Sequence, residues 1–405
     1  MWLTNCQLVD VETGSVQPSA AVEIQGDRIT SVLTGPADRP AGEQVYDLGG
    51  RFLLPGIISC HTHLSVVFPF DATDEHESAG LSAVRAAARA KDALQAGITT
   101  IRCVHEMNRA DLVLRQSARE GWLRIPRIFG AGQALSTTGG HGSGSGCTYV
   151  DGADQFLAAA RAELAAGADH IKVFITGGLA HAGEVMTGMQ VTAAEVGGAV
   201  RAASEKGTYV VAHAANSAAI REALQAGVRS FEHAYELDDE TARAIAAQGA
   251  FLTPTLCVTR MPQWMRDHAF TADQVERAMA AGPQHLDSIK RAVDAGVTLI
   301  NGTDYPPGEA GDDTVAAIRE MEFMAEAGLD PAATLRSVTV NPAKLLSAEH
   351  ELGQVKPGFL ADLIAVDADP TQSVSAIRAV SFVLAAGSVV RDDRPRTQDA
   401  ASGGS

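Results

Sequence analysis

The sequence predicts a (β/α)8 TIM barrel inserted in a small β-sandwich that the two ends of the chain form together. One observation is a repeated pattern in which an alanine-rich helical stretch ends in glycine and a short β-branched run follows directly. A second is that these runs are almost continuously apolar, as parallel strands covered on both faces are. A third is that both ends of the chain carry short strands and turn signals instead. Together they favour an α/β barrel with a β-rich appendage.

Glycine marks the junctions between the expected helices and strands. It ends a helix readily in the left-handed conformation because it has no Cβ atom. The junctions lie at Gly97, Gly121, Gly167, Gly207, Gly227, Gly249 and Gly296. With the run RFLLPGIIS after Gly50, they predict eight strands over roughly residues 50–330. A doubly wound open sheet is the alternative, but it usually carries a glycine-rich nucleotide-binding turn, which is missing here.

We expect the barrel to occupy residues 51–348. Residues 1–50 and 349–392 each hold too little apolar surface to fold alone, so we expect them to build one β-sandwich together. Residues 393–405 end in SGGS and are predicted to form a flexible tail.

The composition indicates a cytoplasmic protein that acts on a small molecule. The chain has 405 residues, 46% of them hydrophobic, and its 49 acidic and 32 basic side chains give a net charge of −17. Such an acidic surface disfavours nucleic-acid and membrane partners. There is no apolar run of membrane-spanning length, no secretory signal, and the five cysteines include no CxxC pair. Self-association into a homo-oligomer stays open.

Several predicted strands end in side chains that bind metal ions. In a (β/α)8 barrel the carboxyl ends of the strands lie at one end, where active sites form. His61 and His63 end the first strand, and their i, i+2 spacing places both imidazoles on one face. His213, His233 and Asp304 end the fifth, sixth and eighth strands. Imidazole and carboxylate groups are ligands of divalent ions such as zinc, so the pattern predicts a metal site.

Lys172 interrupts the apolar fourth strand, HIKVFI. A buried ammonium is costly unless it is paired or chemically altered. One interpretation is a lysine that pairs with a carboxylate or reaches the rim of the barrel. The other is an amine that reacts with carbon dioxide and forms N6-carboxylysine, an anionic group able to bridge two metal ions.

The segments PGIISCHTH, VVAHA, SFEHA, NGTD and LGQVKPGFLADLIAVD, with the fourth-strand lysine, resemble the amidohydrolase superfamily over residues 1–392. Lys172 and the following TGG are similar to the binuclear branch that includes Xaa-Pro dipeptidases and ochratoxin-hydrolysing amidases. This resemblance implies two divalent ions, zinc foremost and cobalt or manganese as alternatives. It assigns one ion to His61, His63 and Asp304, the other to His213 and His233, and the bridge to carboxylated Lys172.

One segment departs from the family pattern. The second strand usually ends in an Arg-Asp-hydrophobic-Gly-Gly stretch, whereas this chain has RCVHEMN. We therefore expect His105 and Glu106 near the rim of the site. The other histidines without a visible partner are expected to be mostly solvated; they are His76, His170, His268, His285 and His350.

The resemblance also implies catalytic and substrate-binding roles. A hydroxide that bridges the metals would attack the substrate carbonyl, and Asp304 would pass its proton to the leaving amine. Tyr235 and His141 are candidates to donate hydrogen bonds to the carbonyl oxygen, although Tyr235 could equally be a packed rim residue. Arg260 is a candidate clamp for a substrate carboxylate. His181, in the loop GGLAHAG, is a candidate substrate contact.

The segment 257–295 is longer than a βα unit requires and carries several apolar side chains. It could be a lid that recognises an apolar or aromatic group, or a helical excursion packed on the barrel or on a partner subunit.

The first functional hypothesis is a binuclear metal hydrolase that cleaves an amide bond of a dipeptide or an N-acyl amino acid. The alternatives on the same metal core are hydrolysis of a carbamate, urea or lactone, or deamination of a ring. A non-catalytic binding protein is the third hypothesis. It is disfavoured because all six expected ligand positions are filled.

Overall fold

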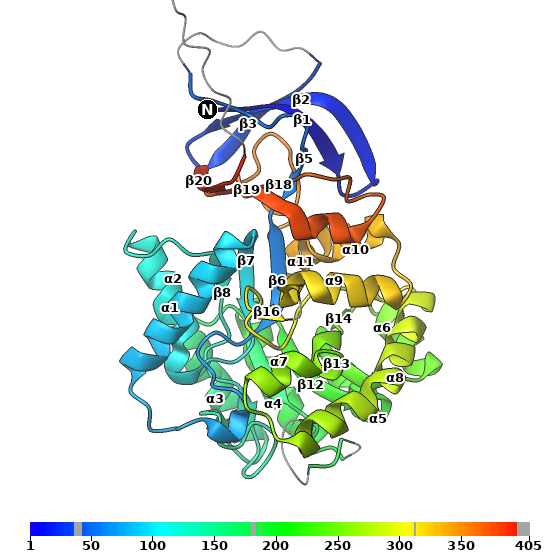
Figure 1. Ribbon diagram of the computed structural model, residues 1–405. Helices are drawn as coiled ribbons and strands as arrows, with labels where there is room; N and C mark the ends of the chain where they lie inside the picture. Colours follow the sequence, from blue (N-terminus) through cyan, green and yellow to red (C-terminus); the bar gives the residue numbers. More distant parts are fainter. Residues whose placement is uncertain (36–42, 180–183, 187, 312, 395–405) are drawn as a thin grey trace, which may run out of the picture.

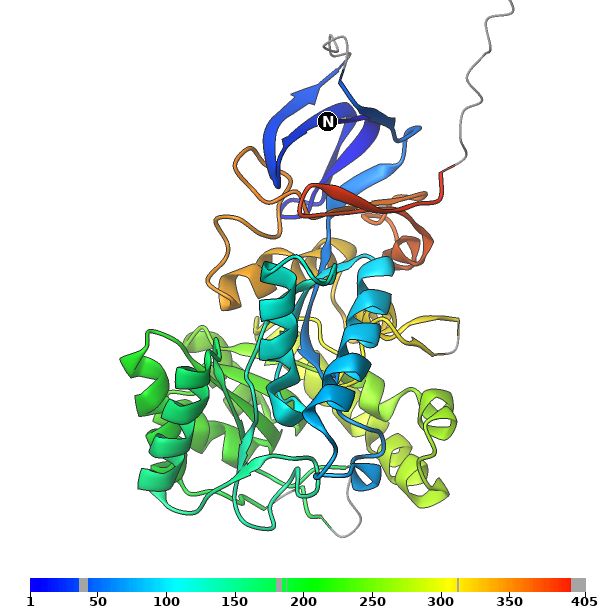
Figure 2. The same ribbon diagram turned by 90° about the vertical axis from the view of Figure 1, so that its left-hand side faces the viewer.

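The computed structural model describes residues 1–35, 43–179, 184–186, 188–311 and 313–394. It has a TIM-barrel-like α/β body with a β-rich part at one end, where the first and last strands of the chain lie together (Figure 1). The short helices α10 (Pro331–Ser337) and α11 (Val340–Leu345) lie between these two parts, as the orange segment in Figure 2 shows. None of the helices in the described residues is long and apolar enough to cross a membrane.

Strands from both ends of the chain form one mixed sheet of eight strands. Along the sheet they are β20 (Ser388–Asp392), β19 (Val380–Ala385), β18 (Leu363–Val366), β5 (Phe52–Pro55), β1 (Trp2–Asp10), β2 (Ser15–Gln25) and β3 (Arg28–Thr34), with β4 (Val45–Asp47) beside β1. The core of this sheet also mixes both ends, because Leu3 and Leu53 pack with Leu363 and Phe382. Each end therefore supplies apolar surface that the other needs.

The run RFLLPGIIS, predicted as a single strand, is divided at Gly56. The part before it, β5, pairs with β1 and β18, whereas the part after it, β6 (Ile57–Thr62), pairs with β7 (Ile98–Cys103) of the barrel body. A Cβ atom on Gly56 would lie 2.2 Å from Oγ1 of Thr99, so a larger residue does not fit there. The chain passes from one sheet to the other at this close contact.

Two parallel sheets contain the strands of the barrel body. One joins β6, β7 and β8 (Arg127–Phe129), and the other joins β10 (Thr148–Tyr149), β9 (Leu135–Ser136), β11 (Ile171–Phe174), β12 (Val210–Asn216), β13 (Ser230–Glu236), β14 (Phe251–Thr253) and β15 (Thr298–Leu299). Backbone hydrogen bonds connect the two sheets at two places. The amide of Cys60 donates to the carbonyl of Asn301 at 2.8 Å, and that of Asp169 donates to Gly130 at 2.7 Å.

In the described residues, eight of these strands are each followed, directly or after short strands and turns, by a helix of at least nine residues. The pairs are β6 and α1 (Ala79–Gln95), β7 and α2 (Ala110–Arg119), β8 and α3 (Ala153–Ala166), β11 and α4 (Ala193–Glu205), β12 and α5 (Ser217–Ala226), β13 and α6 (Asp239–Ala247), β14 and α8 (Ala272–Asp294), and β15 and α9 (Ala316–Glu326). The seven glycines predicted at the junctions all have positive φ, for example 107° at Gly167 and 98° at Gly227. That prediction is confirmed.

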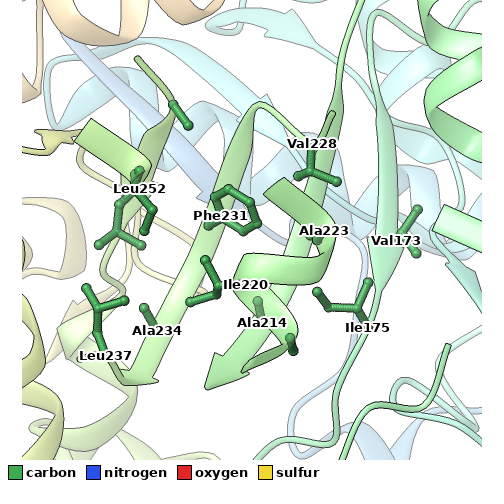
Figure 3. Packing of buried hydrophobic residues seen from close by; sticks show 14 of the residues in the cluster. Val173, Ile175, Ala214, Ile220, Ala223, Val228, Phe231, Ala234, Leu237 and Leu252 are labelled. Carbon is green, nitrogen blue, oxygen red and sulfur yellow. The ribbon is translucent and has the colours of Figure 1, made fainter. Parts of the chain in front are cut away.

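Side-chain alternation along the barrel strands separates an apolar outer layer from a polar interior. Figure 3 shows Ala214 of β12 and Phe231 of β13 near Ile220 of α5, all within one buried cluster. The neighbouring residues His213 and Glu232 are equally buried but point to the other face of the sheet. The strands thus carry polar groups toward the inside of the barrel-like body, while their apolar side chains pack against the helices.

Candidate metal centre

Five of the predicted metal ligands lie close together at the carboxyl ends of the barrel strands. The Nε2 atoms of His61 and His63 lie 2.9 and 3.0 Å from Oδ1 of Asp304. Ligand-type atoms of His61, His233 and Asp304 all lie within 4.8 Å of one another. The ring centroids of His213 and His233 are 4.5 Å apart. The structure therefore brings these side chains to one place from the end of β6 and the residue after it, from β12 and β13, and from the segment after β15.

Two of these residues have a left-handed backbone conformation. The φ angle is 68° at His233 and 64° at Asp304. Such angles are uncommon outside glycine and occur preferentially at functional sites. The amides of Thr303 and Asp304 both donate to the carbonyl of His61, at 3.0 and 3.1 Å. These bonds hold the turn that carries Asp304 against the strand that carries His61.

Hydrogen bonds orient three of the imidazoles. Nδ1 of His61 lies 2.5 Å from a carboxylate oxygen of Glu232, and Nδ1 of His63 donates to a backbone carbonyl at 2.9 Å. Nδ1 of His233 lies 2.7 Å from the hydroxyl of Thr255. A histidine that binds a metal through one ring nitrogen usually makes such a bond with the other. The Nε2 atoms of these three rings are therefore available as ligands.

A fully buried ion pair of Arg102 and Glu232 contacts His61 at its Nδ1 atom. The Arg102 guanidinium donates to Glu232 at 2.8 Å and also to the carbonyl of Cys60, and both charged side chains are inaccessible to solvent. Burial raises the pKa of Glu232, but Arg102 and His61 outweigh this effect and lower it to about 2. Glu232 is therefore an anion fixed beside Nδ1 of His61. Sequence reasoning missed this pair, although each charge interrupts an apolar strand just as Lys172 does.

We predict that Glu232→Gln weakens metal binding. An amide cannot hold Nδ1 of His61 as the carboxylate does, and the loss of such an outer ligand contact typically lowers metal affinity by about 10–100-fold. Zinc affinity measured by competition with a chelator tests this, with Glu236→Gln at the end of the same strand as the matched control. Unchanged affinity in a folded Glu232→Gln protein would contradict the role of this carboxylate.

Lys172 lies on β11 with only 1% of its surface exposed. Its Nζ atom has no hydrogen-bond partner among the described residues and lies 5.3 Å from the ring centroid of Phe174. Burial lowers the pKa of the amine to about 8, although the carboxylates of Glu232 and Asp304 oppose this shift. The first interpretation of Lys172 required a carboxylate partner or a position at the rim. The structure shows neither, because the amine is buried and makes no hydrogen bond to a described residue.

Tyr235 and His141 lie beside the cluster. The Tyr235 ring stacks on His233 with 5.2 Å between centroids, and the His141 ring stacks on His213 at 4.1 Å. Nδ1 of His141 lies 2.6 Å from a carboxylate oxygen of Glu184. Burial raises the pKa of Tyr235 well above its usual value, so its phenol keeps its proton and can donate a hydrogen bond. Both side chains line a cavity of about 30 Å³ that Asp304 also borders.

The segment 257–295 contributes one wall of this cavity. It forms a short 3-10 turn η3 (Leu256–Thr259), then α7 (Pro262–Asp267) and α8. Met265 and Phe270 line the cavity, and Trp264 stacks on Tyr305 with 3.6 Å between centroids. The segment is thus a helical excursion packed on the barrel that also borders the site.

Of the two remaining expected substrate contacts, the structure describes Arg260 and does not place it at the cavity. Arg260 is not among its lining residues. Its guanidinium forms an ion pair with Glu326 and lies 4.8 Å from the ring centroid of Phe323. His181 lies outside the described residues.

The expectation for the remaining histidines is wrong in three cases. His105, His170 and His285 are fully buried rather than solvated or at the rim. Their Nε2 atoms donate to backbone carbonyls at 2.9, 3.0 and 3.0 Å, and burial lowers their pKa values to about 3, 3 and 4. Glu106 is also buried and accepts from the amides of the segment that follows His63. These groups therefore support the fold around the site.

The model of the amidohydrolase family matches residues 52–391 of the chain. Ochratoxinase from Aspergillus niger is 25% identical over 377 residues, which cover 84% of this chain and 75% of that protein. Imidazolonepropionase from Cutibacterium acnes is 26% identical over 414 residues, which cover 95% of this chain and 93% of that protein.

The fold is also similar to that of a solved amidohydrolase-type structure. The crystal structure of a Xaa-Pro dipeptidase with bound methionine in its active site superposes with a TM-score of 0.86 and 29% identity, covering 96% of this chain and 99% of that one. The family model, the relatives and the side chains at the strand ends all indicate the same family. The protein therefore belongs to the amidohydrolase family and is a hydrolase that acts on carbon–nitrogen bonds.

Proposed function

We propose that this chain is a metal-dependent hydrolase that binds two divalent ions and cleaves an amide bond of a small molecule. The observation that carries the proposal is the cluster of His61, His63, His233 and Asp304 beside Lys172, whose buried amine has no hydrogen-bond partner among the described residues. A buried, unpaired amine next to metal-ligating side chains is costly unless it is converted into a ligand.

The ligand side chains of the cluster fit the two divalent ions expected in this branch of the family. His61, His63 and Asp304 would hold one ion, His213 and His233 the other, and Lys172 would bridge them as N6-carboxylysine. Nitrogen and oxygen ligands of this kind suit zinc, and also cobalt or manganese. When bound, such ions lower the pKa of a coordinated water and polarise the carbonyl group of a substrate.

The protein groups around the cluster have distinct roles in this proposal. The Asp304 carboxylate accepts the proton of the attacking water and delivers it to the leaving nitrogen. Tyr235 and His141 donate hydrogen bonds toward the carbonyl oxygen as negative charge develops on it. Met265 and Phe270 exclude water on the side of the helical excursion.

Relatives suggest the substrate classes to test. Prolidases, Xaa-Pro dipeptidases and ochratoxinase are among the similar proteins, which supports dipeptides and N-acyl amino acids as the first classes. A carbamate, urea or lactone hydrolase and a ring deaminase are the alternatives, because the same carbonyl attack serves them. We further propose that the eight strands of the body close into a barrel inserted in a sandwich of both termini. The boundaries are those given above, except that β5 pairs with the terminal strands.

Removal of metal is expected to abolish amide hydrolysis. The protein should contain close to two divalent ions per chain when it is purified without chelator, and a dipeptide and N-acyl-amino-acid library should report its activity. Dialysis against a chelator should remove the ions and the activity. Added zinc, cobalt or manganese should restore the activity, because bound ions would lower the pKa of the attacking water. Full turnover in a preparation free of metal, as measured by elemental analysis, would overturn the proposal.

A further inference from the structure

Glu184 pairs with His141 across two loops of the barrel body. Nδ1 of His141 lies 2.6 Å from Oε2 of Glu184, and the amide of Gly178 donates to the same oxygen at 2.7 Å. His141 follows β9, whereas Glu184 and Gly178 lie between β11 and α4. The exposed fractions are 8% for the His141 side chain and 15% for that of Glu184. The carboxylate is thus mostly shielded from water and joins the two loops beside the metal-ligand cluster.

Other contacts fix where the His141 ring lies. The ring stacks on His213 with 4.1 Å between centroids. A Cβ atom on Gly178 would lie 2.5 Å from Cε1 of the ring, so a larger residue does not fit there. The His141 amide donates to Oε1 of Gln190 at 2.7 Å, and its carbonyl accepts from the Ser136 hydroxyl at 2.8 Å. The bond to Glu184 then determines which edge of the ring faces the carboxylate.

This bond also decides which nitrogen of His141 can meet a substrate. A carboxylate accepts hydrogen bonds, so Nδ1 carries a hydrogen toward Glu184. Nε2 is then the nitrogen that the ring can offer to a substrate in the cavity that His141 lines together with Asp304. An imidazole paired with a carboxylate can carry a proton on both nitrogens, and in that form Nε2 donates a hydrogen bond.

We infer that Glu184 is a positioning residue for the hydrolysis, which orients the His141 imidazole and keeps Nε2 as a donor to the substrate carbonyl oxygen. The inference rests on the proposed amide hydrolysis and deepens it. Negative charge develops on that oxygen as water adds to the carbonyl carbon, and a donor that is already in place stabilises this charge. A neutral side chain at position 184 would hold the ring less firmly and would remove the charge that supports its second proton.

Glu184→Gln tests the inference on the zinc-loaded full-length protein, with an amide of the substrate library. Glutamine has the same length and lacks the charge. We expect kcat to fall at least about tenfold, because loss of one such donor costs about 10²–10³-fold and this variant only weakens the donor. KM should stay within about twofold, since the interaction is strongest in the transition state. Glu222→Gln, at an exposed position of α5, is the matched control and should keep full activity.

A double-mutant cycle with His141→Ala shows whether Glu184 acts through the imidazole. His141→Ala should lower kcat by about 100-fold or more. Addition of Glu184→Gln to His141→Ala should change kcat by less than about twofold, because the carboxylate then has no ring to orient. Glu184→Asp keeps the charge on a shorter side chain and should recover part of the activity that Glu184→Gln loses. A residue that only supports its loop would instead lose the same factor in both backgrounds.

Metal content and melting temperature, measured for every variant, complete the test. We expect both to match those of the parent protein in Glu184→Gln. Equal kcat in the parent and in Glu184→Gln, an equal fall with and without His141, or a loss of metal that accounts for the fall would overturn the inference and leave amide hydrolysis intact. If the metal-loaded parent hydrolyses no amide of the library, the proposed function fails and the inference fails with it.

Discussion

Replacement of Asp304 by asparagine is expected to reduce amide hydrolysis by at least about 100-fold while leaving the protein folded, because loss of a positioned proton-transfer group typically costs 10²–10⁴-fold. Asparagine has the same shape but cannot take up a proton. It also tolerates the left-handed conformation that Asp304 adopts, at φ 64°, so the backbone has no reason to change.

The measurement is kcat for Asp304→Asn, together with its metal content and melting temperature. Asp287→Asn, on the exposed side of α8, is a matched control that should keep full activity. Because Asp304 is also a proposed metal ligand, the metal content separates loss of the proton acceptor from loss of the ions. A folded, metal-loaded variant with normal turnover would assign the proton transfer to another group.

Replacement of Lys172 by alanine is expected to lower kcat/KM by at least about 100-fold. Loss of a residue that only supports a metal ligand costs up to about 100-fold, and Lys172 is proposed as a ligand itself. The proposed carbamate would disappear with the amine, and both ion sites would lose the ligand that they share. Short carboxylates such as acetate or propionate should partly restore activity, because they can occupy the space left by the side chain and supply the missing oxygen atoms.

Lys172→Met is the matched control for this rescue. It fills the same space with an unbranched side chain, so it should be inactive and should not respond to added carboxylate. In metal-free form its stability should be close to that of the metal-free parent protein, because the Lys172 amine has no hydrogen-bond partner to lose among the described residues. If Lys172→Ala retains normal turnover, or if both variants respond equally to acetate, the bridging role is wrong.

The ends of the barrel strands could be predicted because two local rules place them. A near-continuous apolar run after a glycine indicates a buried parallel strand, and all seven junction glycines have the positive φ that this requires. Alternation then decides the face on which a side chain lies, so His61, Lys172 and His213 point into the barrel. No knowledge of distant contacts is needed for either step.

The supporting groups could not be predicted in the same way. Arg102 and Glu232 are 130 residues apart, and His170 donates to a carbonyl 67 residues away. A buried polar side chain is stable only where its partner lies, and such partners are determined by packing between elements. The position of Arg260 could not be predicted for the same reason. It pairs with Glu326 on α9, which is distant in the sequence, and it does not line the cavity.

The order of helices and strands, the inward direction of the metal-ligating side chains and the family resemblance all follow from the chain as written, because they depend on neighbours a few residues apart. The tertiary structure alone decided that β5 belongs with the terminal strands, that Glu232 and Arg102 lie beside His61, and that Arg260 pairs with Glu326. Ion pairs and sheet edges join residues that are remote along the chain, and only folding brings them together.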